Sequence, residues 1–328
     1  MKVLHHISSW MMLLAALLCS TLQSCRGTEN RQDQLIDFSA DNEFLENKST
    51  LVNELQYPGS TFRVYADFNR NTGDVDALFR GTEVSYTAEG VWYYQPLEYW
   101  YTDGDYDFRA VWPASADVVS TVSTGKSINI QNYSVVSDQA YDLMVAYVYR
   151  DMSRPDFSPV DMIFRHALAA VNVIVRKEAD DPQNYTLKDT YFKNMYVAGN
   201  FIFEGNPATP EALSDCWNYT YFQTTACLHQ AYHVAVNTSG NSTVNQFIMP
   251  QEINGTSVAE ENKCRLGYTL IINGNEVSTE VVIPYIEWLP GKVYTYRVTL
   301  KASGADVEVL STEWDKVDVT AEDIYGKI

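Results

Sequence analysis

The sequence has little of what catalysis and metal binding require. Its 328 residues include only five cysteines and five histidines, and no two cysteines have the C-x-x-C spacing of a zinc site. No G-x-S-x-G segment marks a hydrolase nucleophile. Lysine and arginine form no run, and the net charge of −19 repels nucleic acid. We therefore expect no enzyme, no metal or other cofactor, and no nucleic-acid partner.

The fragments that resemble chemical motifs lack the surroundings that the chemistry needs. Residues 125–127 read Gly-Lys-Ser, but the earlier glycine of a phosphate-binding loop is replaced by Ser120, and a strand pattern follows instead of a helix. Residues 227–233 offer one cysteine and two histidines without a fourth ligand nearby, so no zinc site is expected. His166 lies in an apolar strand pattern, where a packed histidine is expected and a catalytic base is not.

Long hydrophobic runs are also absent, and beyond the first 25 residues no segment approaches the roughly 20 apolar residues of a membrane-spanning helix. Residues 10–18 form an apolar stretch that is too short to span a bilayer and is typical of a leader peptide. The following Leu-Gln-Ser-Cys, ending at Cys25, resembles a bacterial lipobox. We therefore interpret residues 1–24 as a lipoprotein signal peptide and residues 25–33 as a tether. Palmitate and related lipid chains on Cys25 would anchor the protein in a membrane, whereas an ordinary secretion signal with an incidental cysteine is the alternative.

Strand-forming residues are abundant, with 23 tyrosines and 13% aromatic residues. Short alternating segments separated by Gly, Pro, Asn or Asp recur at the spacing of a β-sandwich, and residues 268–273 and 278–284 around Gly274-Asn275 predict a hairpin. Residues 150–159 interrupt two long strand patterns with Pro and Asp, which indicates a seam. We predict an all-β protein with two tandem β-sandwich domains, residues 34–155 and 156–328.

Cysteine usage beyond the leader leaves two arrangements open. Cys216, Cys227 and Cys264 are an odd number, so at least one thiol is unpaired. A disulfide between Cys216 and Cys227 would close a hairpin in an oxidising compartment. The alternative is three buried thiols that act as small hydrophobic side chains.

Four segments in a fixed order give the chain a family resemblance. They are DLMVA at 142–146, FRHALAAVNVIV at 164–175, FIMPQEI at 247–253 and WLPGKVYTYRVTL at 288–300. Together they resemble the fimbrillin family of Bacteroidetes surface pilins, the Mfa-like or type V pilin subunits, over about residues 34–314. The resemblance implies sandwiches of Greek-key, transthyretin-like type. It also implies a structural or accessory subunit of a fimbrium, or pilus, at the cell outer membrane that mediates cell adhesion, with other pilin subunits as homo- or heteropolymeric partners.

The same resemblance implies assembly by strand exchange. In that family a trypsin-like protease removes an N-terminal strand, and a donor strand from the next subunit fills the vacated groove. Mapped here, the displaced strand comprises Leu35, Ile36, Asp37, Phe38, Ser39 and Ala40, with Ile36, Phe38 and Ala40 or the opposite set facing inward. Between Arg31 and Arg63 the only basic residue is Lys48. Either Lys48 is the processing site, or the strand stays and the subunit remains a lipid-anchored base or accessory protein.

An aromatic run at residues 92–101 leaves a second function open. Trp92, Trp100 and the tyrosines between them are either a stacking platform for sugars or core side chains, and core packing is the expectation because clustered aromatic residues mostly pack together. The sugar platform would make the protein a stand-alone surface glycan-binding lipoprotein. A host or bacterial surface glycan or protein is the receptor that either function would contact.

Overall fold

The structure is a computed structural model that describes residues 31–42, 55–116, 118–121, 127–137, 140–243, 245–302 and 304–313. Within these ranges the chain forms 24 strands, the five-residue helix α2 (Pro210–Ser214) and one 3-10 turn at Glu260–Asn262. No helix in the described part of the chain is long and apolar enough to cross a bilayer. The prediction of an all-β protein is confirmed.

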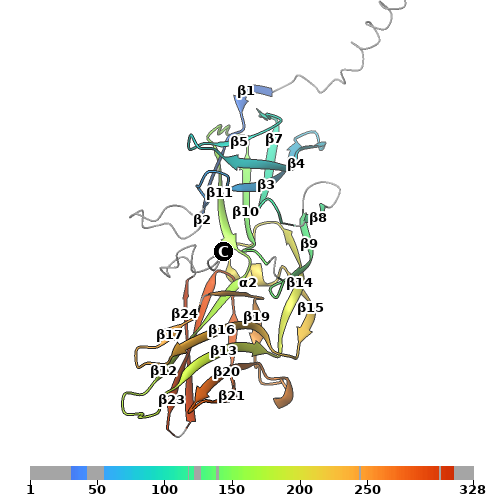
Figure 1. Cartoon of the computed structure of the whole chain (residues 1–328). Helices are drawn as coiled ribbons and strands as arrows, with labels where there is room; N and C mark the ends of the chain where they lie inside the picture. Colours follow the sequence, from blue (N-terminus) through green and yellow to red (C-terminus); the bar gives the residue numbers. More distant parts are fainter. Residues whose placement is uncertain are drawn as a thin grey trace, which may run out of the picture.

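A seven-stranded sheet forms the upper part of the molecule in Figure 1. Its order is β2 (Phe38–Asn42), β11 (Val160–His166), β10 (Met144–Asp151), β7 (Gly104–Trp112), β3 (Thr61–Arg70), β4 (Val75–Tyr86) and β5 (Trp92–Tyr94). The pairing of β2 with β11 is parallel, and the other pairings in this sheet are antiparallel. Strand β11 shows why the sheet has one core face, because Val160, Met162 and Phe164 are buried while the alternate side chains point outward.

Three further sheets form the lower part in Figure 1. The first contains β17 (Asn241–Ser242), β12 (Ala169–Lys177), β23 (Lys292–Lys301) and β24 (Gly304–Glu313), with β18 (Gln246–Ile248) also on β12. The second contains β16 (Cys227–Ala235), β13 (Thr186–Lys193), β20 (Arg265–Ile272) and β21 (Asn275–Val282). The third contains β15 (Trp217–Gln223), β14 (Met195–Glu204), β9 (Ser127–Ser134) and β8 (Val118–Thr121).

Two small ladders complete the fold: β1 (Arg31–Leu35) pairs with β6 (Tyr99–Tyr101), and β19 (Gln251–Ile253) pairs with β22 (Ile286–Trp288). The predicted hairpin at residues 268–284 is confirmed, since β20 and β21 pair antiparallel along their whole length. Its turn lies one residue earlier than the pattern indicates, at Asn273-Gly274, where both residues have positive φ. This conformation matches the right-handed twist of the flanking strands.

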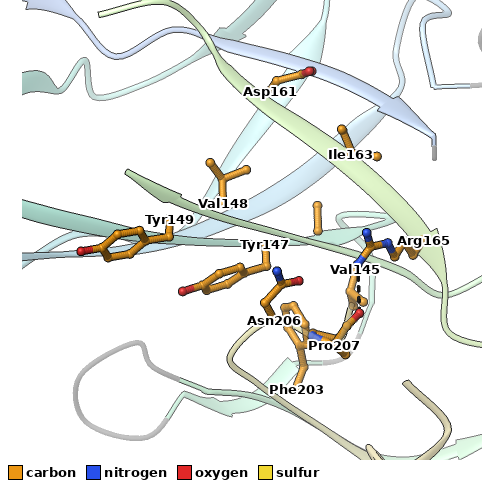
Figure 2. Close-up of a pocket in the computed structure, with 11 residues that line it drawn as sticks. Val145, Tyr147, Val148, Tyr149, Asp161, Ile163, Arg165, Phe203, Asn206 and Pro207 are labelled. Carbon is orange, nitrogen blue, oxygen red and sulfur yellow. Dashed lines mark hydrogen bonds between the residues drawn. The ribbon is translucent and has the colours of Figure 1, made fainter. Parts of the chain in front are cut away.

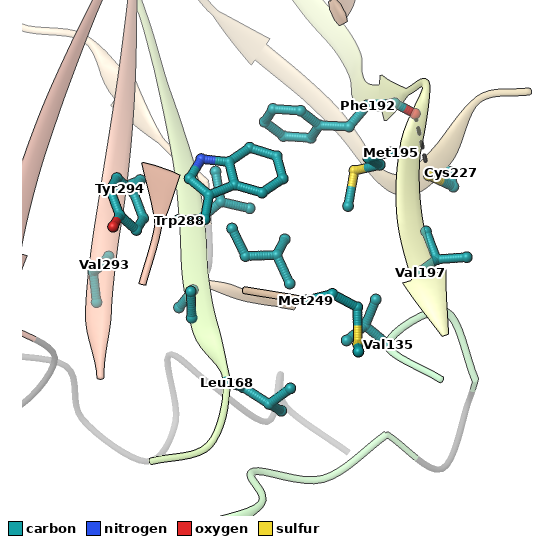
Figure 3. Close-up of a cluster of buried hydrophobic side chains, with 14 of the residues drawn as sticks. Val135, Leu168, Phe192, Met195, Val197, Cys227, Met249, Trp288, Val293 and Tyr294 are labelled. Carbon is teal, nitrogen blue, oxygen red and sulfur yellow. Dashed lines mark hydrogen bonds between the residues drawn. The ribbon is translucent and has the colours of Figure 1, made fainter. Parts of the chain in front are cut away.

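The buried side chains form two hydrophobic clusters, which we call the upper core and the lower core. The upper core is rich in aromatic rings, among them Phe62, Phe79 and Phe108. In the lower core Trp288 packs among Phe192, Met195 and Met249 (Figure 3). The Trp288 Nε1–H donates to the Tyr296 hydroxyl over 2.9 Å. The predicted boundary between two domains at residues 155 and 156 stays a prediction. Strand β11 follows this boundary in the sequence but belongs to the upper sheet, and β9 precedes it but pairs with β14 of the lower part.

Candidate functional site

The N-terminal segment lies at one end of the upper sheet and links two ladders. Strand β1 ends at Leu35, and β2 begins at Phe38, opposite Val160 of β11. Between them, the Ile36 N–H donates to the Glu98 carbonyl over 2.9 Å, and the Asp37 carbonyl accepts from the Val160 N–H over 2.7 Å. The single strand predicted over residues 35–40 is therefore split, because the backbone changes partners at residues 36–37.

The inward-facing side chains of this segment complete the upper core. Ile36, Phe38 and Ala40 are 0%, 6% and 1% exposed, so the first of the two predicted sets faces inward. We call residues 36–40 the N-terminal plug. The Phe38 ring makes edge-to-face contacts with four rings, with centroids 5.4–6.2 Å apart, namely Phe62, Phe79, Tyr94 and Phe108. Full burial of an Ile or Phe side chain stabilises a fold by about 1.5–3 kcal/mol, so the buried side chains of the plug contribute to the stability of the upper core.

Polar contacts fix the plug from three sides. The Tyr94 hydroxyl donates to the Ile36 carbonyl over 2.7 Å, and burial raises the pKa of Tyr94 to about 12, so that this donor keeps its proton at neutral pH. Ser39 Oγ donates to Asp161 Oδ1 over 3.0 Å, and Gln56 Nε2 donates to the Ala40 carbonyl over 3.1 Å. Within the described part of the chain β2 pairs only with β11, so its outer edge is one edge of the seven-stranded sheet.

Two of the predicted sites lie outside the described residues. Cys25, the predicted lipidation site, precedes β1, and Lys48, the predicted processing site, lies in the segment 43–54 that joins β2 to the buried Leu55. Both stay predictions. Lys48 follows the plug and precedes β3 in the sequence, so cleavage there would separate the plug from the rest of the sheet.

The three cysteines of the described residues are free thiols, so the Cys216–Cys227 disulfide is not formed in this structure. The hairpin on which that pairing depended is absent, because β15 pairs with β14 and β16 pairs with β13 in another sheet. Ten residues separate the two cysteines, and seven of them form β15, which is about 23 Å of extended chain. The Cys227 thiol instead donates to the Phe192 carbonyl over 3.3 Å (Figure 3), and the Cys216 thiol to the Ala212 carbonyl over 3.4 Å.

The aromatic run at residues 92–101 mostly serves the core. Trp100 is fully buried, and Tyr94 and Tyr101 are 5% and 6% exposed. Trp92 is half-buried, with ring centroids 5.0 Å from those of Phe62 and Tyr86. The core interpretation is confirmed for these rings, and a sugar platform that uses Trp100 is wrong.

His166 and His229 each lie beside a carboxylate. His166 is 2% exposed, and its Nδ1 lies 2.7 Å from Asp142 Oδ2, as expected for a packed histidine. His229 lies on the surface with Nδ1 2.8 Å from Asp189 Oδ2. Among the residues that the structure describes, no group of three or more His, Cys, Asp and Glu side chains is arranged to hold a metal ion.

Strand β24 forms an edge of the sheet that also contains β12 and β23. Ala305, Val307 and Val309 are half-buried against the lower core, while Asp306 and Glu308 are exposed. The alternation of small apolar and acidic residues was the available signal. Since β24 pairs only with β23, its other edge is open within the described part of the chain.

Comparisons with known proteins agree with this fold. The model of the fimbrillin-like family matches residues 58–320, and no curated protein matches the chain. A fimbrial protein from Bacteroides vulgatus is 14% identical, with a TM-score of 0.57, and the match covers 87% of this chain and all of that one. Putative cell adhesion proteins from Parabacteroides distasonis (11% identity, TM-score 0.52, 86% and 96% covered) and Bacteroides ovatus (12%, 0.50, 87% and 98%) are also similar. The structural likeness shows a shared fold, and the family match shows more: this chain belongs to the fimbrillin-like family.

Proposed function

We propose that the chain is a structural or accessory subunit of a cell-surface fimbria that assembles by strand exchange and mediates adhesion. The observation that carries the proposal is the N-terminal plug, a short buried segment at the open end of a sheet. Family membership supports it, and so do the fimbrial and adhesion proteins that share the fold. As a member of a family of non-enzymatic structural proteins, the chain is not an enzyme, in agreement with its lack of catalytic motifs.

Loss of the plug would create an acceptor groove. The rings of Phe62, Phe79 and Phe108 would lose the Phe38 side chain, and the β11 backbone would lose its parallel partner. A donor strand with apolar side chains at alternate positions restores both the ladder and the packing. Binding of such a strand is strong because it replaces core contacts.

Processing decides between two roles for the subunit. Cleavage after Lys48 would separate the plug, together with lipidated Cys25, from the rest of the chain, whereas cleavage at Arg63 would cut through β3. If Lys48 is cut, the subunit accepts a donor strand and becomes part of the polymer. If it is not, the lipid on Cys25 keeps the subunit at the outer membrane as a base or accessory protein.

The donor strand that fits this groove differs from β24 of the same chain. The plug presents Ile36, Phe38 and Ala40 at alternate positions, whereas β24 presents Ala305, Val307 and Val309. A valine in the place of Phe38 leaves a cavity, which lowers affinity by the packing that is lost. We therefore infer that β24, which already pairs with β23 along its length, is not the donor strand of either a homopolymer or a heteropolymer.

The test is limited digestion of the chain from residue 26 with trypsin, followed by intact mass and a gel of unboiled samples. A single cut after Lys48 and a ladder that boiling removes are the expected results for a polymerising subunit, and Lys48→Gln is the matched control that should show neither. An uncut chain without a ladder would overturn polymerisation and leave the anchored accessory role.

A stand-alone surface glycan-binding lipoprotein is the second candidate. Trp100 of the aromatic run does not support glycan binding, because its side chain is buried. The feature that favours it is a pocket with exposed tyrosines on the outer face of the upper sheet. Saturable sugar binding by a chain that forms no ladder would favour this candidate.

A further inference from the structure

A pocket of about 380 Å³ lies on the outer face of β10 and β11, where the loop after β14 crosses the sheet (Figure 2). Tyr147 and Tyr149 of β10 line it, together with Ile163 of β11. On β11 these outward positions alternate with the side chains that fill the upper core, so the pocket uses the face that the core leaves free. Its volume falls within the range of about 300–1,000 Å³ that is typical of small-molecule sites.

Hydrogen bonds and a cation hold the pocket walls in place. Arg165 Nη1 donates to the Pro207 carbonyl over 2.9 Å, which ties the loop after β14 to β11 (Figure 2). The Tyr147 hydroxyl donates to Asp107 Oδ1 over 2.5 Å, and the buried Arg109 guanidinium lies 5.1 Å from the centre of the Tyr147 ring. The pKa of Tyr147 is raised to about 12 by desolvation and by Asp107, so the phenol stays protonated at neutral pH. Such a wall is pre-organised, and little side-chain entropy is lost when a ligand binds.

The exposed side chains of the pocket combine apolar surface with hydrogen-bonding groups. Tyr149 is 54% exposed and Ile163 is 45% exposed, and Tyr147 stands two residues from Tyr149, about 6.6 Å along the same face. Asp161 adds a carboxylate acceptor, and Asn206 adds an amide that both donates and accepts. A ligand that matches this surface has apolar C–H faces for the rings and hydroxyl groups around them.

Charge narrows the choice of ligand. Asp161 and Arg165 give the pocket one side chain of each sign, so its lining carries no net charge that would select a cation or an anion. The net charge of −19 disfavours anionic ligands further. Aromatic rings with a negative π face attract the weakly positive C–H groups of a pyranose.

We propose that this pocket binds an uncharged saccharide, with one sugar ring on Tyr149 and sugar hydroxyls on Asp161 and Asn206. The inference rests on the adhesion part of the proposed function and names the class of its receptor. The inward side chains of the plug face the upper core, on the other side of the sheet from the pocket, and Asp161 is the residue that both share, since it lines the pocket and accepts from Ser39 of the plug.

The test uses an array of neutral oligosaccharides that end in glucose, galactose, mannose, fucose or N-acetylhexosamine, probed with the chain from residue 26. The methyl glycoside of the sugar that binds is then titrated at millimolar concentration by NMR. We expect Tyr149→Ala to weaken binding about tenfold, because the stacking surface is lost, and Asn206→Ala to weaken it as well. Tyr221→Ala is the matched control, since Tyr221 is 56% exposed on β15 of another sheet and should leave the affinity unchanged.

The outcomes separate this inference from the fimbrial proposal. Saccharide binding that Tyr149→Ala weakens and Tyr221→Ala does not supports the pocket, whether or not trypsin produces a ladder. The absence of binding to every neutral sugar, or equal binding by Tyr149→Ala and the unaltered chain, overturns it even when the ladder forms. Self-association that Tyr149→Ala abolishes, without saccharide binding, would also overturn it and identify the pocket as a contact between copies.

Discussion

Replacement of Phe38 by alanine tests the role of the N-terminal plug most directly. The change removes a ring that is 6% exposed and lies between the rings of Phe62, Phe79, Tyr94 and Phe108. Phe→Ala substitutions in cores destabilise by about 3–5 kcal/mol. Because Phe38 lies on the end strand of a sheet, where neighbours can relax into the space, we expect the lower end, about 3 kcal/mol.

Urea denaturation of the chain from residue 26 measures this loss. The midpoint should fall without a change in slope, since the unfolded state exposes nearly the same surface. Ile163→Ala is the matched control, because Ile163 is 45% exposed on the neighbouring strand and its truncation should change the free energy of unfolding by less than about 0.5 kcal/mol.

The same substitution should also loosen the plug after proteolysis. A loss of about 3 kcal/mol corresponds to about 150-fold weaker retention of the cleaved N-terminal peptide. Gel filtration after cleavage at Lys48, with both fragments weighed by mass spectrometry, compares retention in the two proteins. A destabilisation below about 1 kcal/mol, or equal retention of the peptide, would refute the assignment of Phe38 as the centre of the plug.

Three further predictions follow from buried polar groups. Because the folded pKa of Tyr94 is raised to about 12, above an unfolded value of 10.0, its contribution to stability is complete below about pH 10 and falls as pH rises toward 12. Tyr94→Phe should therefore lower the urea midpoint at pH 8, because its hydrogen bond is lost. Between pH 8 and pH 11 the free energy of unfolding should fall less for Tyr94→Phe than for the unaltered chain. A difference between the two proteins that stays the same over this range would contradict the prediction. Asp142→Ala should destabilise by about 3 kcal/mol because it leaves buried His166 without its carboxylate, whereas Asp189→Ala at the exposed His229 should cost less than about 1 kcal/mol. Burial raises the pKa of Cys216 to about 11, that of Cys227 to about 12 and that of Cys264 still further, so a thiol reagent at pH 8 should label none of them rapidly in the folded chain and all three in urea; a mass that increases by only one label in urea would reveal a disulfide between the other two cysteines.

Local patterns were sufficient to predict many of the strands, although for residues 35–40 they left open which set of side chains faces inward. The alternation of Ile36, Phe38 and Ala40 predicted a half-buried strand, and the hairpin at residues 265–282 follows from its turn residues. Both depend on neighbours in the sequence. The same local logic placed the aromatic rings of residues 92–101 in a core.

Contacts between residues that are distant in the sequence could not be predicted from these local patterns. The split of the plug at residues 36–37 depends on Glu98 and Val160, and the loss of the Cys216–Cys227 pairing depends on β14 and β13. The pocket was not predicted for a similar reason. In the sequence Tyr147 and Tyr149 have the pattern of ordinary outward-facing strand residues, and the pocket depends on the loop at Asn206, which is distant in the sequence. Such a site arises from tertiary arrangement, which alternation along one strand does not encode.

The parallel pairing of β2 with β11 has a consequence for the order of events during export. Ser39 bonds to Asp161, 122 residues further along the chain, so the segment that emerges first must wait for one of the later strands of the upper sheet before it can dock. Contacts of such long range form slowly because the intervening chain must first be closed into a loop. The upper core therefore stays open at the β11 edge until β11 has formed, and under the proposed strand exchange the chain's own N-terminus would compete with any foreign strand for that edge during this interval.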